Sequence, residues 1–204
     1  MNCLEMKEGN SLVRVFHAVP NGPDIDIYMD DTLIFSSSKY SNFTEYVYSI
    51  NSNHQVDIYI SGTKENPIAS ATVNFSESEL ITLAVIGNLK DVSLLVITDY
   101  ISKEPSSEYS TARIIHLSKA TPGVDVYIDG DILFTDIEYK QGTRYLDFNI
   151  GKYHIKIVEH DSERVILPLK INLKPNRIYT IYIVGEKDNV GVIQSVDGNT
   201  YVCE

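Results

Sequence analysis

The chain carries one pattern twice: LVRVFHAVPNGPDIDIYMDD at residues 12–31 and TARIIHLSKATPGVDVYIDG at residues 111–130. At an offset of 99, identical residues coincide at Arg14/Arg113, His17/His116, Pro23/Pro122, Asp26/Asp125, Tyr28/Tyr127, Asp30/Asp129, Phe35/Phe134, Tyr40/Tyr139, Thr44/Thr143, Tyr46/Tyr145 and Ile58/Ile157. One deletion changes the offset to 98 and adds Asn74/Asn172, Thr82/Thr180, Gly87/Gly185, Val92/Val190 and Asp99/Asp197. Because chance does not keep one register this long, the chain is a duplicated domain and not an array of short repeats.

The duplication predicts the domain boundaries. We expect a flexible segment at residues 1–10, a first domain at 11–100, a linker at 101–110 and a second domain at 111–204. The linker includes SKEPSSEY at residues 102–109, which is polar, charged and contains a proline, as connecting segments do. A domain of roughly 90 residues buries somewhat over 60% of its unfolded surface, which is enough for a core of its own.

Apolar and polar residues alternate at period two within each copy. Every second residue is apolar in VDVYID at residues 124–129, and the segments 24–29 and 55–60 repeat the pattern. This is typical of half-buried strands with one wet face. No spacing for a strand–helix–strand unit occurs, so a parallel sheet is not expected. With seven or eight short strands in each copy, the sequence predicts an all-β protein of two tandem Ig-like antiparallel β-sandwich domains.

Aspartate and glycine mark the expected turns. Asp30-Asp31 and Asp129-Gly130 stand between short apolar runs, where a tight hairpin needs residues that tolerate positive φ. Gly87 and Gly185 follow longer apolar runs and predict the next strand ends.

Composition and charge argue against several classes of protein. The net charge is -11 and the pI about 4.8, so nucleic-acid binding is not expected, because it depends on clustered Lys and Arg. No run of about 18 apolar residues occurs, so membrane insertion is not expected. The opening MNCLEMKEGN lacks the basic start and apolar core of a secretion signal, which predicts synthesis in the cytoplasm without a signal peptide. For Cys3 and Cys203 we expect reduced thiols, with cross-linking between chains as the alternative.

Each copy also carries a version of one longer motif. The first has HAVP at 17–20 and IDIY at 25–28, and the second has HLSK at 116–119 and VDVYIDG at 124–130. The chain thereby resembles the bacterial DUF4397 family, whose pattern runs from His-Ala-x-Pro through a Pro-containing loop to Val-Asp-Val-Tyr-x-Asp-Gly. The second copy departs from His-Ala-x-Pro, and the first lacks the final Gly. The resemblance implies a sandwich fold and a cell-envelope or spore-coat setting typical of spore-forming Firmicutes. It implies no reaction, since the family's biochemical function is not defined.

Histidine and aspartate repeat at matched positions, as His17 with Asp26 and as His116 with Asp125. One interpretation is a His–Asp pair on neighbouring strands that orients a ligand, a metal or a nucleophile. The interpretation we favour is structural: a carboxylate or a loop carbonyl satisfies the ring nitrogen and fixes the Pro-containing loop. No third group repeats nearby, so the protein is not expected to be an enzyme.

Tyrosine is the compositional anomaly, with 14 Tyr against six Phe and no Trp. If the repeated pairs Tyr28/Tyr127 and Tyr46/Tyr145 point outward, they form a stacking surface for a sugar or a partner protein. The interpretation we favour is structural: the rings are half-buried on strands, and their hydroxyls stay in contact with water. The candidate binding residues are therefore His17, Asp26, Tyr28, Tyr46, His116, Asp125, Tyr127 and Tyr145.

The acidic clusters of the two copies, Asp24, Asp26, Asp30 and Asp31 in the first and Asp125, Asp129 and Asp131 in the second, raise the question of calcium. Their spacing is not that of an EF-hand, and hairpin turns with a solvated face explain them. Zinc-ligand spacing and phosphate-binding glycine loops are absent from the sequence. We therefore expect no metal and no cofactor.

The sequence favours a non-catalytic structural or protein-interaction module of a bacterial cell surface or spore coat. Its partners would be other surface or coat proteins. The alternative is a module that binds a carbohydrate or wall polymer through the repeated tyrosines. A hydrolase built on the His–Asp pairs is the least favoured. The oligomeric state is left open.

Overall fold

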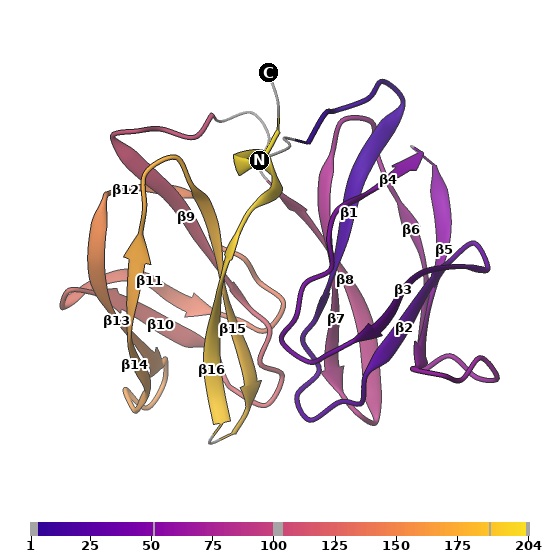
Figure 1. Cartoon of the computed structure of the whole chain (residues 1–204). Coiled ribbons are helices and arrows are strands. Elements are labelled where there is room, and N and C mark those ends of the chain that lie inside the picture. The colour runs from indigo at the N-terminus through magenta and orange to yellow at the C-terminus, as the bar shows by residue number, and fades with distance from the viewer. Residues whose placement is uncertain (1–3, 51, 100–103, 188, 203–204) are drawn as a thin grey trace. The chain divides into compact units, whose positions relative to one another are not determined.

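The computed structural model describes residues 4–50, 52–99, 104–187 and 189–202. The chain divides into two compact units, residues 1–102 with 201–204 and residues 103–200. Each unit is a sandwich of two four-stranded sheets, as the strands in Figure 1 show. The predicted all-β fold of two sandwiches is confirmed. Over the described ranges, helix is limited to a single 3-10 turn, Gly198–Thr200, and no helix there is long and apolar enough to cross a membrane.

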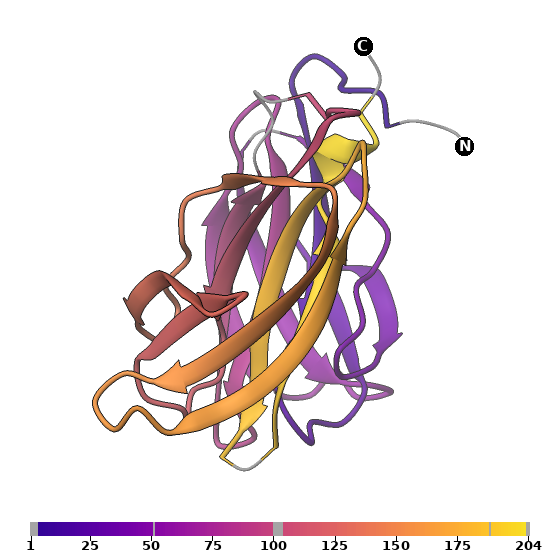
Figure 2. The ribbon, with the colours of Figure 1, turned by 90° about the vertical axis from the view of Figure 1, so that its left-hand side faces the viewer.

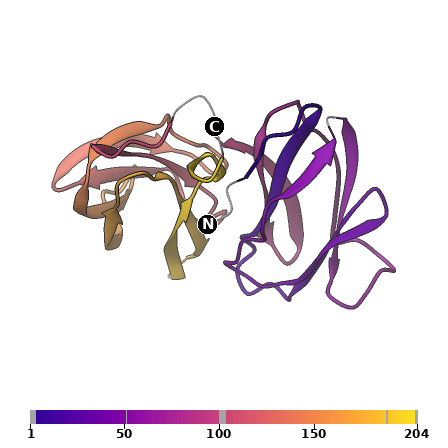
Figure 3. The same ribbon diagram turned by 45° about the horizontal axis from the view of Figure 1, so that its top comes forward.

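The described residues of the first unit form eight strands. They are β1 (Asn10–His17), β2 (Ile25–Met29), β3 (Thr32–Ser38), β4 (Val47–Ile50), β5 (Asn53–Ile60), β6 (Ala69–Asn74), β7 (Leu80–Asn88) and β8 (Asp91–Asp99). One sheet, here the β1 sheet, has the order β4-β1-β7-β8, and the other, the β2 sheet, has the order β3-β2-β5-β6. Figure 3 shows these strands, in indigo to magenta, as two layers.

The described residues of the second unit repeat this arrangement. Its strands are β9 (Tyr109–His116), β10 (Val124–Ile128), β11 (Asp131–Ile137), β12 (Leu146–Asn149), β13 (Gly151–Glu159), β14 (Val165–Leu173), β15 (Ile178–Glu186) and β16 (Asn189–Val196). The β9 sheet has the order β12-β9-β15-β16, and the β10 sheet has the order β11-β10-β13-β14. The long β13–β14 hairpin, in orange, crosses the side of the second unit that faces the viewer in Figure 2.

One strand pair in each unit is parallel, which differs from a purely antiparallel sandwich. β1 pairs with β7 in parallel, from Leu12 opposite Leu80 to His17 opposite Val85, and β9 pairs with β15 in the same way. Between β1 and β7 the chain passes through five other strands, which is ample for a crossover. Apolar and polar residues alternate at period two in parallel and in antiparallel strands alike, so the sequence pattern does not reveal that this pair is parallel.

The predicted hairpin turns are confirmed. Asp30 and Asp31 join β2 to β3 with φ of 49° and 62°, and Asp129 and Gly130 join β10 to β11 with φ of 48° and 100°. Two consecutive residues with positive φ are what a two-residue hairpin turn of type I′ requires.

Gly87 and Gly185 each stand one residue before the end of a strand, with φ of 105° and 101°. A Cβ atom at Gly87 would lie 2.0 Å from the carbonyl oxygen of Asp91, and one at Gly185 would lie 2.1 Å from that of Asn189. Both glycines are therefore required by the β7–β8 and β15–β16 hairpins.

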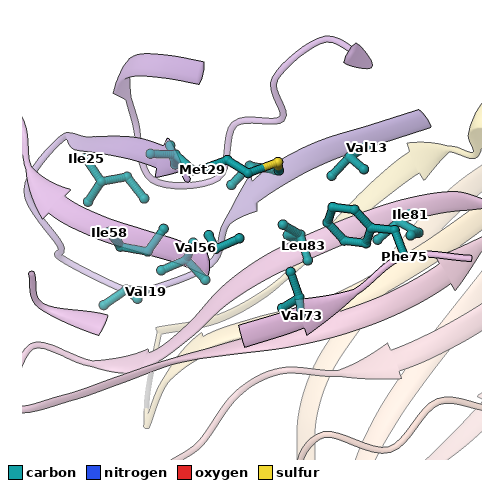
Figure 4. Close-up of a cluster of buried hydrophobic side chains, with 13 residues drawn as sticks. Val13, Val19, Ile25, Met29, Val56, Ile58, Val73, Phe75, Ile81 and Leu83 are labelled. Atoms are coloured by element: carbon teal, nitrogen blue, oxygen red, sulfur yellow. The ribbon is translucent and has the colours of Figure 1, made fainter. Parts of the chain in front are cut away.

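Each unit has a hydrophobic core between its own two sheets. Figure 4 shows the core of the first unit, which consists of Val13, Val15, Val19, Ile25, Ile27, Met29, Val56, Ile58, Val73, Phe75, Ile81, Leu83 and Val85. The core of the second unit consists of Ala112, Ile114, Val124, Val126, Ile137, Ile155, Ile157, Ile171, Leu173, Tyr179, Ile181 and Ile183. Burying one aliphatic side chain of this size contributes about 1.5–3 kcal/mol, so each unit has its own source of stability.

The first strand of each unit begins slightly before the expected boundary. β1 begins at Asn10, within the segment expected to be flexible, and β9 begins at Tyr109, within the expected linker. Cys3 and Cys203 lie outside the described residues, so the expectations for their thiols stay predictions.

Candidate functional site

His17 is buried at the end of β1, and both of its ring nitrogens are engaged. Nε2–H donates to the carbonyl oxygen of Pro23 at 3.0 Å, and Nδ1 accepts from the Val19 N–H at 3.3 Å. Burial lowers the pKa of His17, and the Pro23 carbonyl offsets this only in part. His116 makes the same contacts with the Pro122 carbonyl at 3.2 Å and the Ser118 N–H at 3.2 Å. The structural interpretation of the two histidines is confirmed.

Asp26 binds backbone amides. Its two carboxylate oxygens accept from the N–H groups of Ser37 at 2.8 Å and Gly62 at 2.9 Å. Ser37 has a φ of 53° at an irregularity in the β2–β3 pairing, so the carboxylate holds the bulge in place. Burial acts most strongly on the pKa of Asp26 and raises it, but the amides of Gly62 and Ser37, with the Ser61 hydroxyl, together hold it below its ordinary value.

Asp125 has the same place in the second unit and accepts from the N–H of Asp136 at 2.9 Å. It also meets a histidine, His160, whose Nδ1 lies 2.8 Å from Oδ1. This hydrogen bond is the main reason that the pKa of His160 is raised. His160 has no histidine counterpart in the first copy, where Ser61 stands at the matching position, so the repeat does not mark it.

The less favoured interpretation, a pair formed by each histidine and the aspartate nine residues later, does not occur in the structure. No contact joins His17 to Asp26 or His116 to Asp125 within the part of the chain that the structure describes. The histidine ends a strand of one sheet and the aspartate lies in the other sheet. A binding role for these four residues stays a prediction.

Tyr46 belongs to a polar network on the β1 sheet. Its hydroxyl donates to Asp99 Oδ2 at 2.6 Å, and the Thr82 hydroxyl donates to the same oxygen at 3.2 Å. Arg14 Nε–H donates to Thr82 Oγ1 at 2.9 Å. The second unit repeats the three contacts: Tyr145 to Asp197 at 2.6 Å, Thr180 to Asp197 at 2.8 Å and Arg113 to Thr180 at 2.9 Å. The hydroxyls of Tyr46 and Tyr145 are thus hydrogen-bonded to carboxylates, which identifies a structural role for these repeated tyrosines.

Tyr28 and Tyr127 lie on the outer faces of the β2 and β10 sheets, each half-buried. A lysine ammonium lies over each ring at 4.3 Å, from Lys64 on Tyr28 and from Lys156 on Tyr127. Tyr28 also meets the edge of Tyr59, with ring centroids 5.3 Å apart. Tyr127 is therefore the less enclosed of the two rings.

A pocket of about 520 Å³ lies beside Tyr127. β10, β13, β14 and the turn after β10 supply its lining, which consists of Tyr127, Gly130, His154, Ile155, Lys156, Pro168, Leu169 and Lys170. Of this set, Tyr127 alone was a candidate binding residue from the sequence, and Gly130 was expected only as part of a turn. The alternation of strand β13 places Lys156 and His154 on the exposed face, but a lone period-two pattern does not show which neighbouring strand completes a pocket.

The carboxylates of Asp30 and Asp129, in the two hairpin turns, accept hydrogen bonds. Asp30 accepts from His54 Nδ1 at 2.6 Å and from the Gln55 N–H at 2.9 Å, and these bonds, led by that of His54, lower its pKa. Asp129 accepts from the His154 N–H at 2.9 Å. Among the described residues no group of three or more His, Cys, Asp or Glu is placed to hold a metal ion.

The chain is similar to solved structures only distantly. The carbohydrate-binding module CBMbc (family CBM26) of Amy13K from Eubacterium rectale, in complex with maltoheptaose, is 9% identical, with a TM-score of 0.32, and the match covers 93% of this chain and 99% of that chain. A leucine-rich repeat protein from Bacteroides thetaiotaomicron is 10% identical, with a TM-score of 0.23, over 88% of this chain and 26% of that chain. Scores this low carry no argument about function.

No curated protein matches the sequence. A family model described as "Domain of unknown function (DUF4397)" matches it twice, at residues 11–125 and 110–201. These two matches span the two sandwiches from one end to the other. The chain belongs to the DUF4397 family, as a tandem pair of its domains.

Proposed function

We propose that the protein is a non-catalytic module that binds a carbohydrate or wall polymer on the outer face of the β10 sheet. The pocket of about 520 Å³ beside Tyr127 is the observation that carries this proposal. Its volume lies within the range of ordinary ligand pockets. An aromatic ring stacks against the apolar face of a sugar, and polar side chains around it orient the hydroxyl groups.

The engagement of the repeated histidines supports a role without catalysis. A general base needs a ring nitrogen or carboxylate oxygen within reach of a substrate. In His17 and His116 both ring nitrogens are hydrogen-bonded to the backbone, and Asp26 uses both carboxylate oxygens on backbone amides.

Binding to soluble polysaccharides tests the proposal. The full chain is run through native gels that contain one polysaccharide each, and pulled down on purified cell walls. We expect retardation by at least one polymer, and about tenfold weaker binding for Tyr127→Ala. Tyr28→Ala, the matched control in the first unit, should bind as the parent does. If no polymer retards the chain, or if Tyr127→Ala binds equally well, the proposal fails.

A structural or protein-interaction role is the second candidate. The observation that favours it is a repeated exposed aliphatic residue: Leu33 in β3 is 46% exposed and Ile132 in β11 is 51% exposed. Both strands are edge strands, where an apolar residue invites pairing with another chain. Replacing Leu33 and Ile132 by Lys should abolish cross-linking to a partner in cell extracts, and unchanged cross-linking would exclude this surface.

The proposal includes a location at a bacterial cell surface or in the spore coat, which the family resemblance implies. Immunoblots of cytosol, wall and spore fractions test it. Recovery from the cytosol alone would contradict the location.

A further inference from the structure

The outer faces of the β2 and β10 sheets carry opposite chemistry at matched positions. The duplication offsets pair each position of β5 and β6 with one of β13 and β14, and the strand registers agree. The first unit has Asn53, Gln55, Asp57 and Thr72 where the second unit has Lys152, His154, Lys156 and Lys170. A neutral or acidic residue is thus replaced by a basic one at all four positions.

In the first unit these side chains bond to one another. Gln55 Nε2 donates to Asp57 Oδ1 at 3.1 Å and to Ser70 Oγ at 2.7 Å. The Ser70 hydroxyl also donates to Asp57, and the Thr72 hydroxyl donates to Gln55 Oε1 at 3.1 Å. The outer face of the β2 sheet is therefore already satisfied by its own side chains.

In the second unit the basic side chains stand exposed without such bonds. Within the described ranges, Lys152, Lys156 and Lys170 have no side-chain hydrogen bond or ion pair, and Lys156 meets only the Tyr127 ring. The His154 side chain is 69% exposed, with its Nδ1 3.5 Å from Asp129 Oδ1. Three ammonium groups on two neighbouring strands are left for a ligand to neutralise.

The register of the β13–β14 pair brings the basic side chains together. His154 lies opposite Lys170, and Lys156 lies opposite Pro168 on the same strand pair. Side chains opposite or diagonal to one another in a sheet are neighbours, and like charges at that spacing repel. An anion bound between Lys156 and Lys170 would remove this repulsion.

The basic residues of the chain are also unevenly shared. Of the 17 Lys and Arg, 5 lie in residues 1–102 and 12 lie in residues 103–200. A local basic face on an acidic chain attracts anionic ligands over a distance of about one Debye length, ~8–10 Å at ordinary salt.

We propose that the pocket beside Tyr127 binds an anionic polysaccharide, whose carboxylate or phosphate groups pair with Lys156 and Lys170, and that the first unit lacks this activity. This inference rests on the proposed function and names its ligand class. The Lys156 ammonium lies over the Tyr127 ring at 4.3 Å, so a sugar at this ring brings its acidic substituents next to Lys156 and Lys170.

A sugar polymer fits this face better than nucleic acid does. Glu159 lies on β13 with Lys156, Asp125 lies on the neighbouring strand β10, and the whole chain has a net charge of -11. Binding to a phosphate backbone needs many cations along a continuous track. A face with a few lysines around one aromatic ring suits a polysaccharide whose acidic groups are spaced along the polymer.

The experiment measures the affinity of the full chain for four probes: polygalacturonate, a phosphomannan, neutral dextran and double-stranded DNA. We expect one of the two acidic polysaccharides to bind at least about tenfold more tightly than dextran, and its affinity to fall as salt increases. The two acidic probes distinguish carboxylate from phosphate.

The double variant Lys156→Gln/Lys170→Gln should weaken that binding about tenfold or more. The matched control Lys39→Gln/Lys64→Gln removes two charges from the first unit. It should change the affinity for the acidic polysaccharide by less than about twofold. Equal thermal unfolding of both variants and the parent shows that folding is intact.

The other outcomes separate three claims: the anionic ligand, the proposed function and the choice of a sugar polymer. If dextran binds as tightly as the acidic probes and the lysine variants have no effect, the anionic ligand is wrong and the proposed function stands. If no polysaccharide binds, both fail. If DNA binds as tightly as the acidic polysaccharides, the face is a general polyanion surface and the choice of a sugar is wrong.

Discussion

His17 donates from Nε2–H to the carbonyl oxygen of Pro23, 3.0 Å away, and thereby closes the loop between β1 and β2. The other ring nitrogen accepts from the Val19 N–H. Because one nitrogen donates and the other accepts, the ring must be neutral and carry its proton on Nε2. His116 and Pro122 repeat the relationship at 3.2 Å. Protonation would replace the accepted hydrogen bond by a repulsion between two donors.

Acidification should therefore destabilise both units. Burial holds the pKa of His17 and His116 below the ordinary 6.5, so below that pH the unfolded chain binds protons that the folded chain does not. The contribution of the two neutral histidines to the free energy of unfolding is therefore greatest above about pH 6.5 and decreases as the pH falls below that value. Urea unfolding at pH 8, 7, 6 and 5 measures this. His17→Gln/His116→Gln should flatten the slope, and an unchanged slope would contradict the explanation.

His160 should act in the opposite direction. The hydrogen bond with Asp125 raises its pKa, so its contribution is full below the unfolded pKa of about 6.5 and is lost as the pH rises through the folded pKa. His160→Gln should therefore reduce the free energy of unfolding more at pH 6 than at pH 8. An equal loss at both pH values would mean that the bond does not depend on charge.

Tyr46→Phe should lower the free energy of unfolding by about 1.5–3 kcal/mol, because its hydroxyl donates to the carboxylate of Asp99. Tyr145→Phe should cost a similar amount through Asp197. Tyr28→Phe is the control, since the Tyr28 contacts are made by its ring, and should change stability by less than about 0.5 kcal/mol. Chemical denaturation measures all three, and equal stabilities would exclude the network as a source of stability.

Gly185→Ala should destabilise the second unit by about 2 kcal/mol or more. Its φ of 101° is costly for a residue with a Cβ atom, which would lie 2.1 Å from the Asn189 carbonyl oxygen. At Gly151, a Cβ atom would meet nothing within 4 Å. Gly151→Ala should therefore be neutral or slightly stabilising. Thermal unfolding of the two variants tests the contrast, and equal midpoints would contradict it.

The lining of the pocket was the part of the candidate site least accessible from sequence. Lys156 and Lys170 are ordinary exposed positions on alternating strands, and nothing in their local pattern sets them apart. They become neighbours only because β13 pairs with β14 in one particular register. Tyr127 was identified because it repeats, while the residues that distinguish its surroundings from those of Tyr28 do not repeat.

Local chemistry was enough to determine much of the fold. The duplication could be predicted because identical residues recur at one offset. The alternating strands and the turns at Asp30-Asp31 and Asp129-Gly130 could be predicted because the apolar period and positive φ are properties of a few adjacent residues. Other features depended on which strands meet in space, and only the tertiary structure decided them. These are the parallel β1–β7 pair, the binding of His17 to a carbonyl instead of to Asp26, and the basic face beside Tyr127. The physical reason is that pairing and register are set by burial of the whole sandwich, which no short stretch of sequence records.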